Sequence, residues 1–183
     1  MPDHNLAGAQ GAEVIIMILP LDKATVMAEK IVAELRPFCE RIEIAGSIRR
    51  RRPQVNDIDL VLVPSDLAGL RDRLFRRCRR ITDAEQTIVV ETPGRVQLDV
   101  WIARPAVKDL FGVKPGNFGT LWLCRTGSRE HNIWLIGHAE KMGLRWNPYH
   151  GVFDGHGKCL ACAEEADIFA ALELAFVPPE ERS

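Results

Sequence analysis

Residues 44–63 decide the fold, and they read Ile-Ala-Gly-Ser-Ile-Arg-Arg-Arg-Arg-Pro-Gln-Val-Asn-Asp-Ile-Asp-Leu-Val-Leu-Val. The apolar run over 60–63 predicts a buried strand that begins at Asp57. Side chains alternate between the two faces of a strand, so Asp57 and Asp59 lie on one face, about 7 Å apart along the chain. Two neighbouring carboxylates repel each other, and their burial is costly without a cation. Such hard oxygen ligands suit Mg²⁺ or Mn²⁺.

A candidate phosphate-binding turn precedes these aspartates. Gly46 and Ser47 follow a predicted strand over 41–45, and a Gly-Ser turn after a strand offers backbone N–H groups and a hydroxyl to an anion. Arg50 adds positive charge beside the turn. A phosphate site next to a metal site is the arrangement that holds a nucleoside triphosphate through metal bridges.

A third carboxylate, Asp99, lies within another predicted strand. The segments 86–91 and 95–103 predict a hairpin around Pro93 and Gly94. Strand pairing could bring all three carboxylates together. The alternative is that each aspartate merely begins or edges a strand.

The composition is that of a folded globular protein, with 183 residues of which 46% are apolar and 27% are charged. The longest apolar run, 14–19, is shorter than the roughly 20 residues that a membrane helix needs, and its acidic surroundings do not suit a secretory signal. Five cysteines without such a signal predict reduced thiols and a cytoplasmic protein. Cys159 and Cys162 form a single CxxC motif without a second pair of ligands. We therefore expect them to be two small side chains in a hairpin and not a zinc site.

Positive charge is concentrated in residues 41–80, where eleven arginines accompany five acidic residues. Arginine presents a planar fork of donors that suits phosphate. The candidate nucleic-acid contacts lie on and just after a predicted helix over 67–79, and they are Arg71, Arg73, Arg76, Arg77, Arg79 and Arg80. The alternative is a solvated helix face that binds nothing.

The order of these motifs resembles a known family. Gly46-Ser-Ile-Arg-Arg followed by Asp57-Ile-Asp59 resembles the signature of the nucleotidyltransferase superfamily, in the form found in the family X DNA polymerases, the polymerase beta group. Val96-Gln-Leu-Asp99-Val resembles the strand with that family's third carboxylate. Thr126-Gly-Ser-Arg-Glu-His-Asn132 resembles its nucleotide-binding segment, and later segments resemble its thumb: 148–153, 164–169 and 177–181.

The resemblance implies an α+β fold. A nucleotidyltransferase palm, made of a mixed β-sheet with helices on one side, is expected over 20–104, and a small α/β thumb over 105–183. Residues 1–19 are expected to form a partly disordered N-terminal segment. The lyase domain and the fingers region that family members commonly carry are expected to be missing.

The resemblance also implies the residues of the site. Asp57, Asp59 and Asp99 would be catalytic and would bind two Mg²⁺ ions, with Mn²⁺ as a possible substitute. Ser47 and Arg50 would contact the triphosphate. The full set of implied nucleotide contacts is Gly46, Ser47, Arg50, Gly127, Ser128 and Asn132.

The expected function is template-directed DNA polymerisation, which adds nucleotides to a primer 3′-OH in gap filling or DNA repair. Expected partners are primer-template or gapped DNA and nucleoside triphosphates; we expect no membrane partner and a monomer. Two alternatives stay open. One is a template-independent nucleotidyltransferase that acts on RNA, a protein or a small molecule, and the other is a non-catalytic nucleic-acid-binding module.

The chain departs from the family just before Thr126. Cys124 and Arg125 stand where an aromatic pair is usual. The resemblance implies that this segment lies beside the ribose of the incoming nucleotide, so a small side chain and a flexible charged one predict weak crowding of its 2′-OH and poor discrimination between ribonucleotides and deoxyribonucleotides. The alternative is that the backbone carbonyl alone excludes the 2′-OH.

Overall fold

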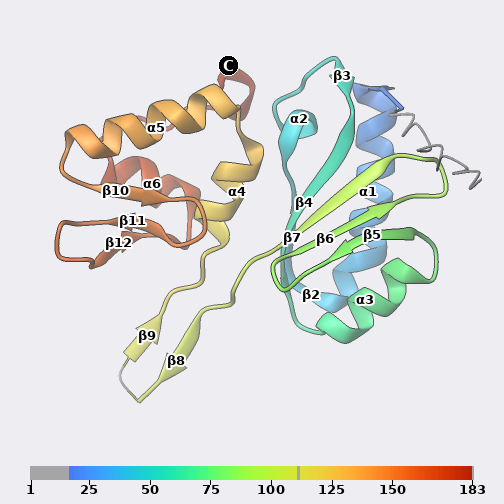
Figure 1. The fold of residues 1–183 in the computed structure, drawn as a ribbon, viewed down its shortest axis with the longest axis horizontal. Helices are drawn as coiled ribbons and strands as arrows, with labels where there is room; N and C mark the ends of the chain where they lie inside the picture. The colour runs from blue at the N-terminus through green and yellow to red at the C-terminus, as the bar shows by residue number, and fades with distance from the viewer. Residues whose placement is uncertain (1–16, 111, 183) are drawn as a thin grey trace, which may run out of the picture.

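The computed structural model describes residues 17–110 and 112–182 and gathers them around two main hydrophobic cores (Figure 1). The predicted disorder of the N-terminal segment falls mostly on residues outside these ranges. Within the described part, Leu19–Pro20 forms β1, a short strand that pairs with β3 (Gln54–Val55).

A five-stranded mixed sheet forms the first part of the molecule, and we call this part, with its helices, the sheet region. Its strand order is β2-β4-β7-β6-β5. The strands are β2 (Cys39–Ile44), β4 (Asp57–Pro64), β5 (Arg79–Asp83), β6 (Thr87–Glu91) and β7 (Gln97–Ile102). β4 and β7 are parallel, whereas the other neighbours are antiparallel. The parallel register places Asp59 opposite Asp99.

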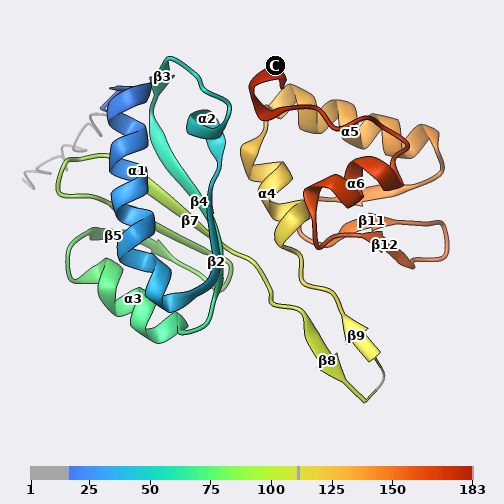
Figure 2. The ribbon, with the colours of Figure 1, turned by 180° about the vertical axis from the view of Figure 1, so that it is seen from behind.

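The two faces of this sheet pack against different partners. Ile58, Leu60 and Leu62 of β4 belong to the core that the sheet shares with α1 (Leu21–Leu35) and α3 (Leu67–Phe75). The alternate residues Val61 and Val63 pack with Phe118 and Leu121 in a separate cluster. Figures 1 and 2 show α1 and α3 together on one side of the sheet. Because Asp57 and Asp59 alternate with Ile58 and Leu60, both aspartates lie on the face opposite α1 and α3.

The second part, which we call the helical region, combines three helices with a small sheet. α4 (Phe118–Thr126) leads through Gly127 and Ser128 into α5 (Arg129–Lys141), and α6 (Glu165–Ala171) follows later. The antiparallel sheet contains β10 (Arg145–Asn147), β11 (Gly151–Phe153) and β12 (Cys159–Ala161). These elements confirm the expected α+β fold, whereas the expected boundary after residue 104 stays a prediction.

A buried ion cluster joins the two regions. Arg49, the last residue of α2 (Gly46–Arg49), donates to both carboxylate oxygens of Glu165 at 3.0 and 2.6 Å. Arg182 donates to the same carboxylate at 2.7 Å, and both Glu165 and Arg182 are buried. Because the two arginines share one buried carboxylate, the ion cluster can form in only one relative position of the sheet region and the helical region.

One local prediction was wrong, and one element was not predicted. The helix predicted over 67–79 ends at Phe75, and Arg79–Asp83 forms β5 at the exposed edge of the sheet. Charged side chains are typical of such edges because they discourage pairing with other chains. The segment after residue 104 also contains an unpredicted hairpin of β8 (Val107–Asp109) and β9 (Gly112–Lys114), which extends away from both regions (Figures 1 and 2).

None of the helices in the described ranges is both long enough and apolar enough to cross a membrane.

Candidate active site

The three predicted carboxylates lie on the two parallel strands at the middle of the sheet. Asp57 and Asp59 are the first and third residues of β4, and Asp99 is the third residue of β7. Each is partly buried. The register and the alternation of side chains therefore bring the three aspartates to the same face, toward α4.

Burial and mutual repulsion shift the acidity of these groups. Burial is the main cause of a rise in the pKa of Asp59 to about 7, and the charges of Asp57 and Asp99 add to it. Burial also raises the pKa of Asp57 and of Asp99. Negative charge is thus disfavoured here unless a cation accompanies it.

The donor set fits a hard divalent cation. Three carboxylates supply the oxygen ligands that Mg²⁺ and Mn²⁺ prefer, and a cation would relieve their repulsion. In the described part of the chain, no three potential metal ligands are close enough together to hold an ion as they stand. One oxygen of Asp59 accepts from Trp101 Nε1 at 3.2 Å, and one of Asp99 accepts from Gln97 Nε2 at 2.8 Å.

The Gly-Ser turn lies directly against this cluster. Gly46 has φ of +60°, and a side chain there would overlap Asp59 Oδ2. Ser47 Oγ is buried without a hydrogen-bond partner among the described residues, and the same holds for Arg50 Nε. Buried donors without partners are uncommon in folded proteins, and here they suit the oxygens of an anion.

Arg50 bridges the turn and the helical region. Its Nη1 donates to the carbonyl oxygen of Thr126, and a β-carbon on Gly127 would lie 2.9 Å from the same nitrogen. Burial lowers the pKa of the Arg50 guanidinium. The structure thus brings Ser47, Arg50 and Gly127 together at the side of the carboxylates.

Ser128 and Asn132 have local roles at the start of α5. Ser128 Oγ accepts from the backbone N–H of His131 at 3.2 Å and caps the helix. Asn132 Nδ2 donates to the carbonyl oxygen of Cys124 at 2.8 Å, and its Oδ1 is buried with no partner in the described residues. Contact between Asn132 and a base stays a prediction.

The flexibility expected of Arg125 is wrong. Its guanidinium carbon lies 3.3 Å from the centre of the Trp101 ring, and its Nη2 donates to the hydroxyl of Tyr149. The argument for weak 2′-OH exclusion relied on a side chain free to move, and these contacts remove that premise. No local sequence pattern signals this stack, because Trp101 and Arg125 lie on different elements.

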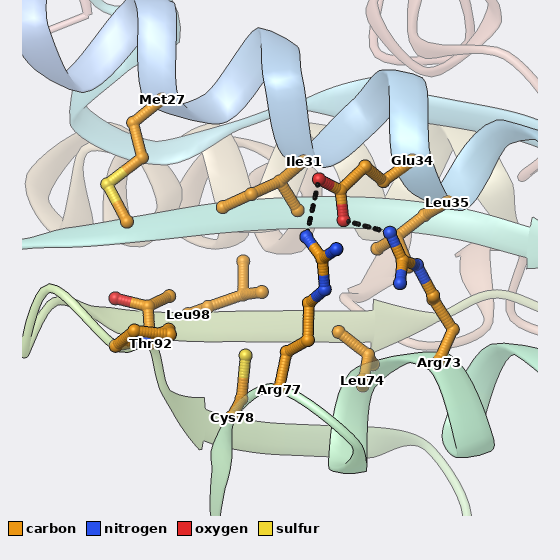
Figure 3. A pocket seen from close by; sticks show the side chains of 11 residues that line it. Met27, Ile31, Glu34, Leu35, Arg73, Leu74, Arg77, Cys78, Thr92 and Leu98 are labelled. Carbon is orange, nitrogen blue, oxygen red and sulfur yellow. Dashed lines mark hydrogen bonds and ion pairs between the residues drawn. The ribbon is translucent and has the colours of Figure 1, made fainter.

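Of the predicted DNA-contacting arginines, all but Arg79 lie on the side of the sheet that α1 and α3 cover, whereas Arg79 on the edge strand β5 pairs with Glu91 on the face of Asp99. Figure 3 shows Arg73 and Arg77 reaching Glu34 of α1 across a cavity of about 150 Å³ between α1 and α3. Three other arginines of this set form ion pairs: Arg71 with Asp83, Arg76 with Asp72, and Arg79 with Glu91. Arg80 lies near the ring of Phe75. These side chains are therefore not brought to the carboxylates, and contact with DNA stays a prediction.

A mixed sheet with three carboxylates on two parallel strands, followed by a mixed helical region, is consistent with the palm and thumb class of fold. Residues 121–183 match the family described as the DNA polymerase beta thumb.

Two similar proteins agree with this class. The chain is 26% identical over 165 residues to the DNA polymerase/3′-5′ exonuclease PolX of Bacillus subtilis (strain 168), a match that covers 89% of the chain. The chain spans 28% of the length of that relative. The crystal structure of Leishmania infantum polymerase beta in a ternary P/T complex has a TM-score of 0.72 at 18% identity, covering 93% of this chain and 78% of that one. The chain is thus similar in sequence to a family X DNA polymerase and in fold to polymerase beta.

Proposed function

We propose that the chain transfers nucleotides from nucleoside triphosphates to the 3′-OH of a primer on template DNA. The observation that carries this proposal is the placement of Asp57, Asp59 and Asp99 on one face, beside a Gly-Ser turn whose buried donors lack partners in the described residues. Primer-template or gapped DNA would be the partner, in gap filling or repair within the cytoplasm, by a monomer. The relatedness to family X polymerases supports the DNA substrate.

Each residue would have a separate part in the reaction. Ser47 and Arg50 would bind and orient the triphosphate. The 3′-oxygen forms a bond to the α-phosphorus while the bond to pyrophosphate breaks, and the leaving group takes the electron pair. Asp99 would receive the proton of the 3′-OH. Asp57, Asp59 and Asp99 would hold two Mg²⁺ ions, which supply positive charge to the phosphate oxygens.

Primer extension tests the proposal. With Mg²⁺ and nucleoside triphosphates, we expect the chain to extend primers on gapped and primer-template DNA, and to add little to a single strand. Asp59→Ala or Asp99→Ala should lower the rate by about 10³-fold or more, the scale expected for a principal charge-stabilising group. Both variants should stay folded, because removal of one carboxylate relieves repulsion.

Each other outcome supports a different function. Addition to single strands without a template would indicate the template-independent nucleotidyltransferase. DNA binding without any transfer would indicate a non-catalytic module. Extension that survives in both aspartate variants would show that the site has been wrongly assigned.

A further inference from the structure

We propose that Trp101, Arg125 and Tyr149 form a positioning stack that fixes the carboxylate of Asp59 for nucleotidyl transfer. This inference rests on the proposed function and gives a role to three residues that the sequence motifs leave without one. Trp101 belongs to the sheet region, whereas Arg125 and Tyr149 belong to the helical region. The stack therefore links the position of the helical region to one carboxylate.

The first contact orients Asp59. Trp101 lies two residues after Asp99 on β7, on the same face, and its Nε1 donates to Asp59 Oδ1 at 3.2 Å. The other oxygen, Oδ2, lies against Gly46, where a β-carbon would overlap it. Both oxygens of Asp59 are thus restrained, one by a donor and the other by the turn. A ligand carboxylate held from both sides needs little reorganisation when it binds.

The second contact holds Trp101 in place. The Arg125 guanidinium carbon lies 3.3 Å from the centre of the Trp101 ring, which is close enough for a planar cation to stack on an indole. The charge of Arg125 also attracts the carboxylates of Asp59 and Asp99. Trp101 is therefore held from the side of α4 while its indole N–H faces Asp59.

The third contact anchors Arg125. Its Nη2 donates to the hydroxyl of Tyr149, which lies between β10 and β11. The backbone N–H of Tyr149 donates to Asn147 Oδ1 at 2.9 Å, and its carbonyl accepts from Asn117 Nδ2 at 2.7 Å. The far end of the stack is thus fixed by the loop, so displacement of the loop would reach Asp59 through Arg125 and Trp101.

The chain contains a matched pair for comparison. Arg49 lies 3.3 Å from the ring centre of Trp122, the same distance as in the proposed stack. The indole N–H of Trp122, however, donates to the carbonyl oxygen of Ile44 at 3.0 Å. Trp122→Phe is therefore the control for Trp101→Phe. Both substitutions remove an indole N–H beneath a stacked arginine, but only Trp101→Phe removes a hydrogen bond to a carboxylate.

Indole N–H signals in ¹⁵N-labelled full-length protein test the stack without any activity. The chain has four tryptophans, and Trp101→Phe and Trp122→Phe assign the two signals of interest. We expect Arg125→Met and Tyr149→Phe to shift the Trp101 signal and to leave the Trp122 signal in place. Addition of MgCl₂ alone should also shift the Trp101 signal selectively. A Trp101 signal that stays unmoved in Arg125→Met would overturn the proposal.

Steady-state kinetics then test positioning. Trp101→Phe keeps an aromatic ring but removes the donor, so kcat for primer extension should fall by about 10–100-fold, the usual effect of losing a partner of a ligand. The KM for nucleotide should change little, and Trp122→Phe should stay near the wild type. Arg125→Met should add no further loss to Trp101→Phe, because residues that act through one another are not additive.

Two kinetic results would count against the stack. One is a wild-type kcat in Trp101→Phe, and the other is a double variant whose loss equals the product of the single losses. A wild-type protein without any transfer would instead refute the proposed function, and the indole signals would still decide whether the stack holds Trp101.

Discussion

Gly46 combines a backbone conformation that favours glycine with a close approach to the carboxylate of Asp59. Its φ of +60° favours glycine, and a β-carbon would overlap Asp59 Oδ2. We expect Gly46→Ala to lower the free energy of unfolding by about 1–2 kcal/mol, the cost of a left-handed conformation for alanine. Primer extension should fall by about 10²-fold, because a displacement near 1 Å has that effect on a reacting group.

The control is another glycine with open surroundings. Gly137 lies inside α5, and no described atom lies within 4 Å of where its β-carbon would stand. Gly137→Ala should therefore raise the free energy of unfolding by about 0.5–1 kcal/mol, with extension unchanged. Urea unfolding and primer extension measure both effects. Equal behaviour of the two variants would show that the contact between Gly46 and Asp59 does not matter.

His131 makes the stability of the protein depend on pH. Burial is the main cause that lowers its pKa from 6.5 to about 4, with the charge of Arg182 as a further cause. The unfolded chain therefore binds a proton at this group more readily than the folded chain does. As pH falls from about 6.5 to about 4, the free energy of unfolding decreases progressively.

Urea unfolding at several pH values between 7 and 4 measures this dependence. His131→Phe keeps a ring beside Trp134 and Phe169 and removes the proton, so its stability should fall less over that window. His156→Gln, at an exposed position, should keep the wild-type slope. If the slope of His131→Phe equals that of the wild type, another group is responsible.

Among the secondary-structure elements, α6 has a glutamate at its N-cap and another at its first position, and the two make ion pairs of nearly equal length in different surroundings. Glu164 contacts Arg41 at 2.7 Å with both side chains partly exposed, and Glu165 contacts Arg49 at 2.6 Å in a buried site. Loss of a partner from a buried pair leaves an unpaired charge. Glu165→Gln should therefore lower the free energy of unfolding by about 3–5 kcal/mol.

Glu164→Gln serves as the matched control. Exposed pairs contribute about 0.2–1 kcal/mol, so its urea midpoint should stay close to that of the wild type. Similar losses in the two variants would contradict the buried ion cluster as a joint between the sheet and helical regions.

The arginines of α3 and β5 offer a test at the level of a surface. Arg76, Arg79 and Arg80 are exposed, and exposed pairs are weak enough to be exchanged for phosphate. Reversing all three to glutamate should weaken DNA binding and reduce its dependence on salt, since each phosphate contact releases counterions. Nucleotide binding should not change, because β6 separates the edge strand β5 from Asp99 on β7, and the ion pairs of Arg76 and Arg79 are with residues other than the three aspartates.

A salt titration of DNA affinity measures this. Lys23→Glu with Lys30→Glu, at exposed positions on α1, is the charge control. If both variants bind DNA as the wild type does, the arginines form only a solvated face.

At the scale of the whole molecule, the sequence predicted those features that depend on local pattern. The apolar run over 60–63 marked β4, and the alternation of side chains along a strand placed Asp57 and Asp59 on one face. The position of Asp99 beside them depends on the parallel register of β4 and β7, which the sequence left open. β5 was missed because its arginines suit an exposed strand edge and a helix surface equally well. Some roles depend on partners that lie far away in the chain, and no local pattern encodes such contacts. This applies to Trp101, Arg49 and Arg182.

The buried joint between α2 and α6 has a consequence for biosynthesis. All strands of the five-stranded sheet lie within residues 39–102, whereas the partners of Arg49 follow 77 residues later at Thr126 and 116 residues later at Glu165. At ribosomal rates of about 5–20 residues per second, the 63 residues between the end of β7 and Glu165 take roughly 3–13 seconds, so the sheet can assemble before Glu165 exists. During that interval the arginine-rich turn at the carboxylates is open to any polyanion, including the RNA of the ribosome that makes it.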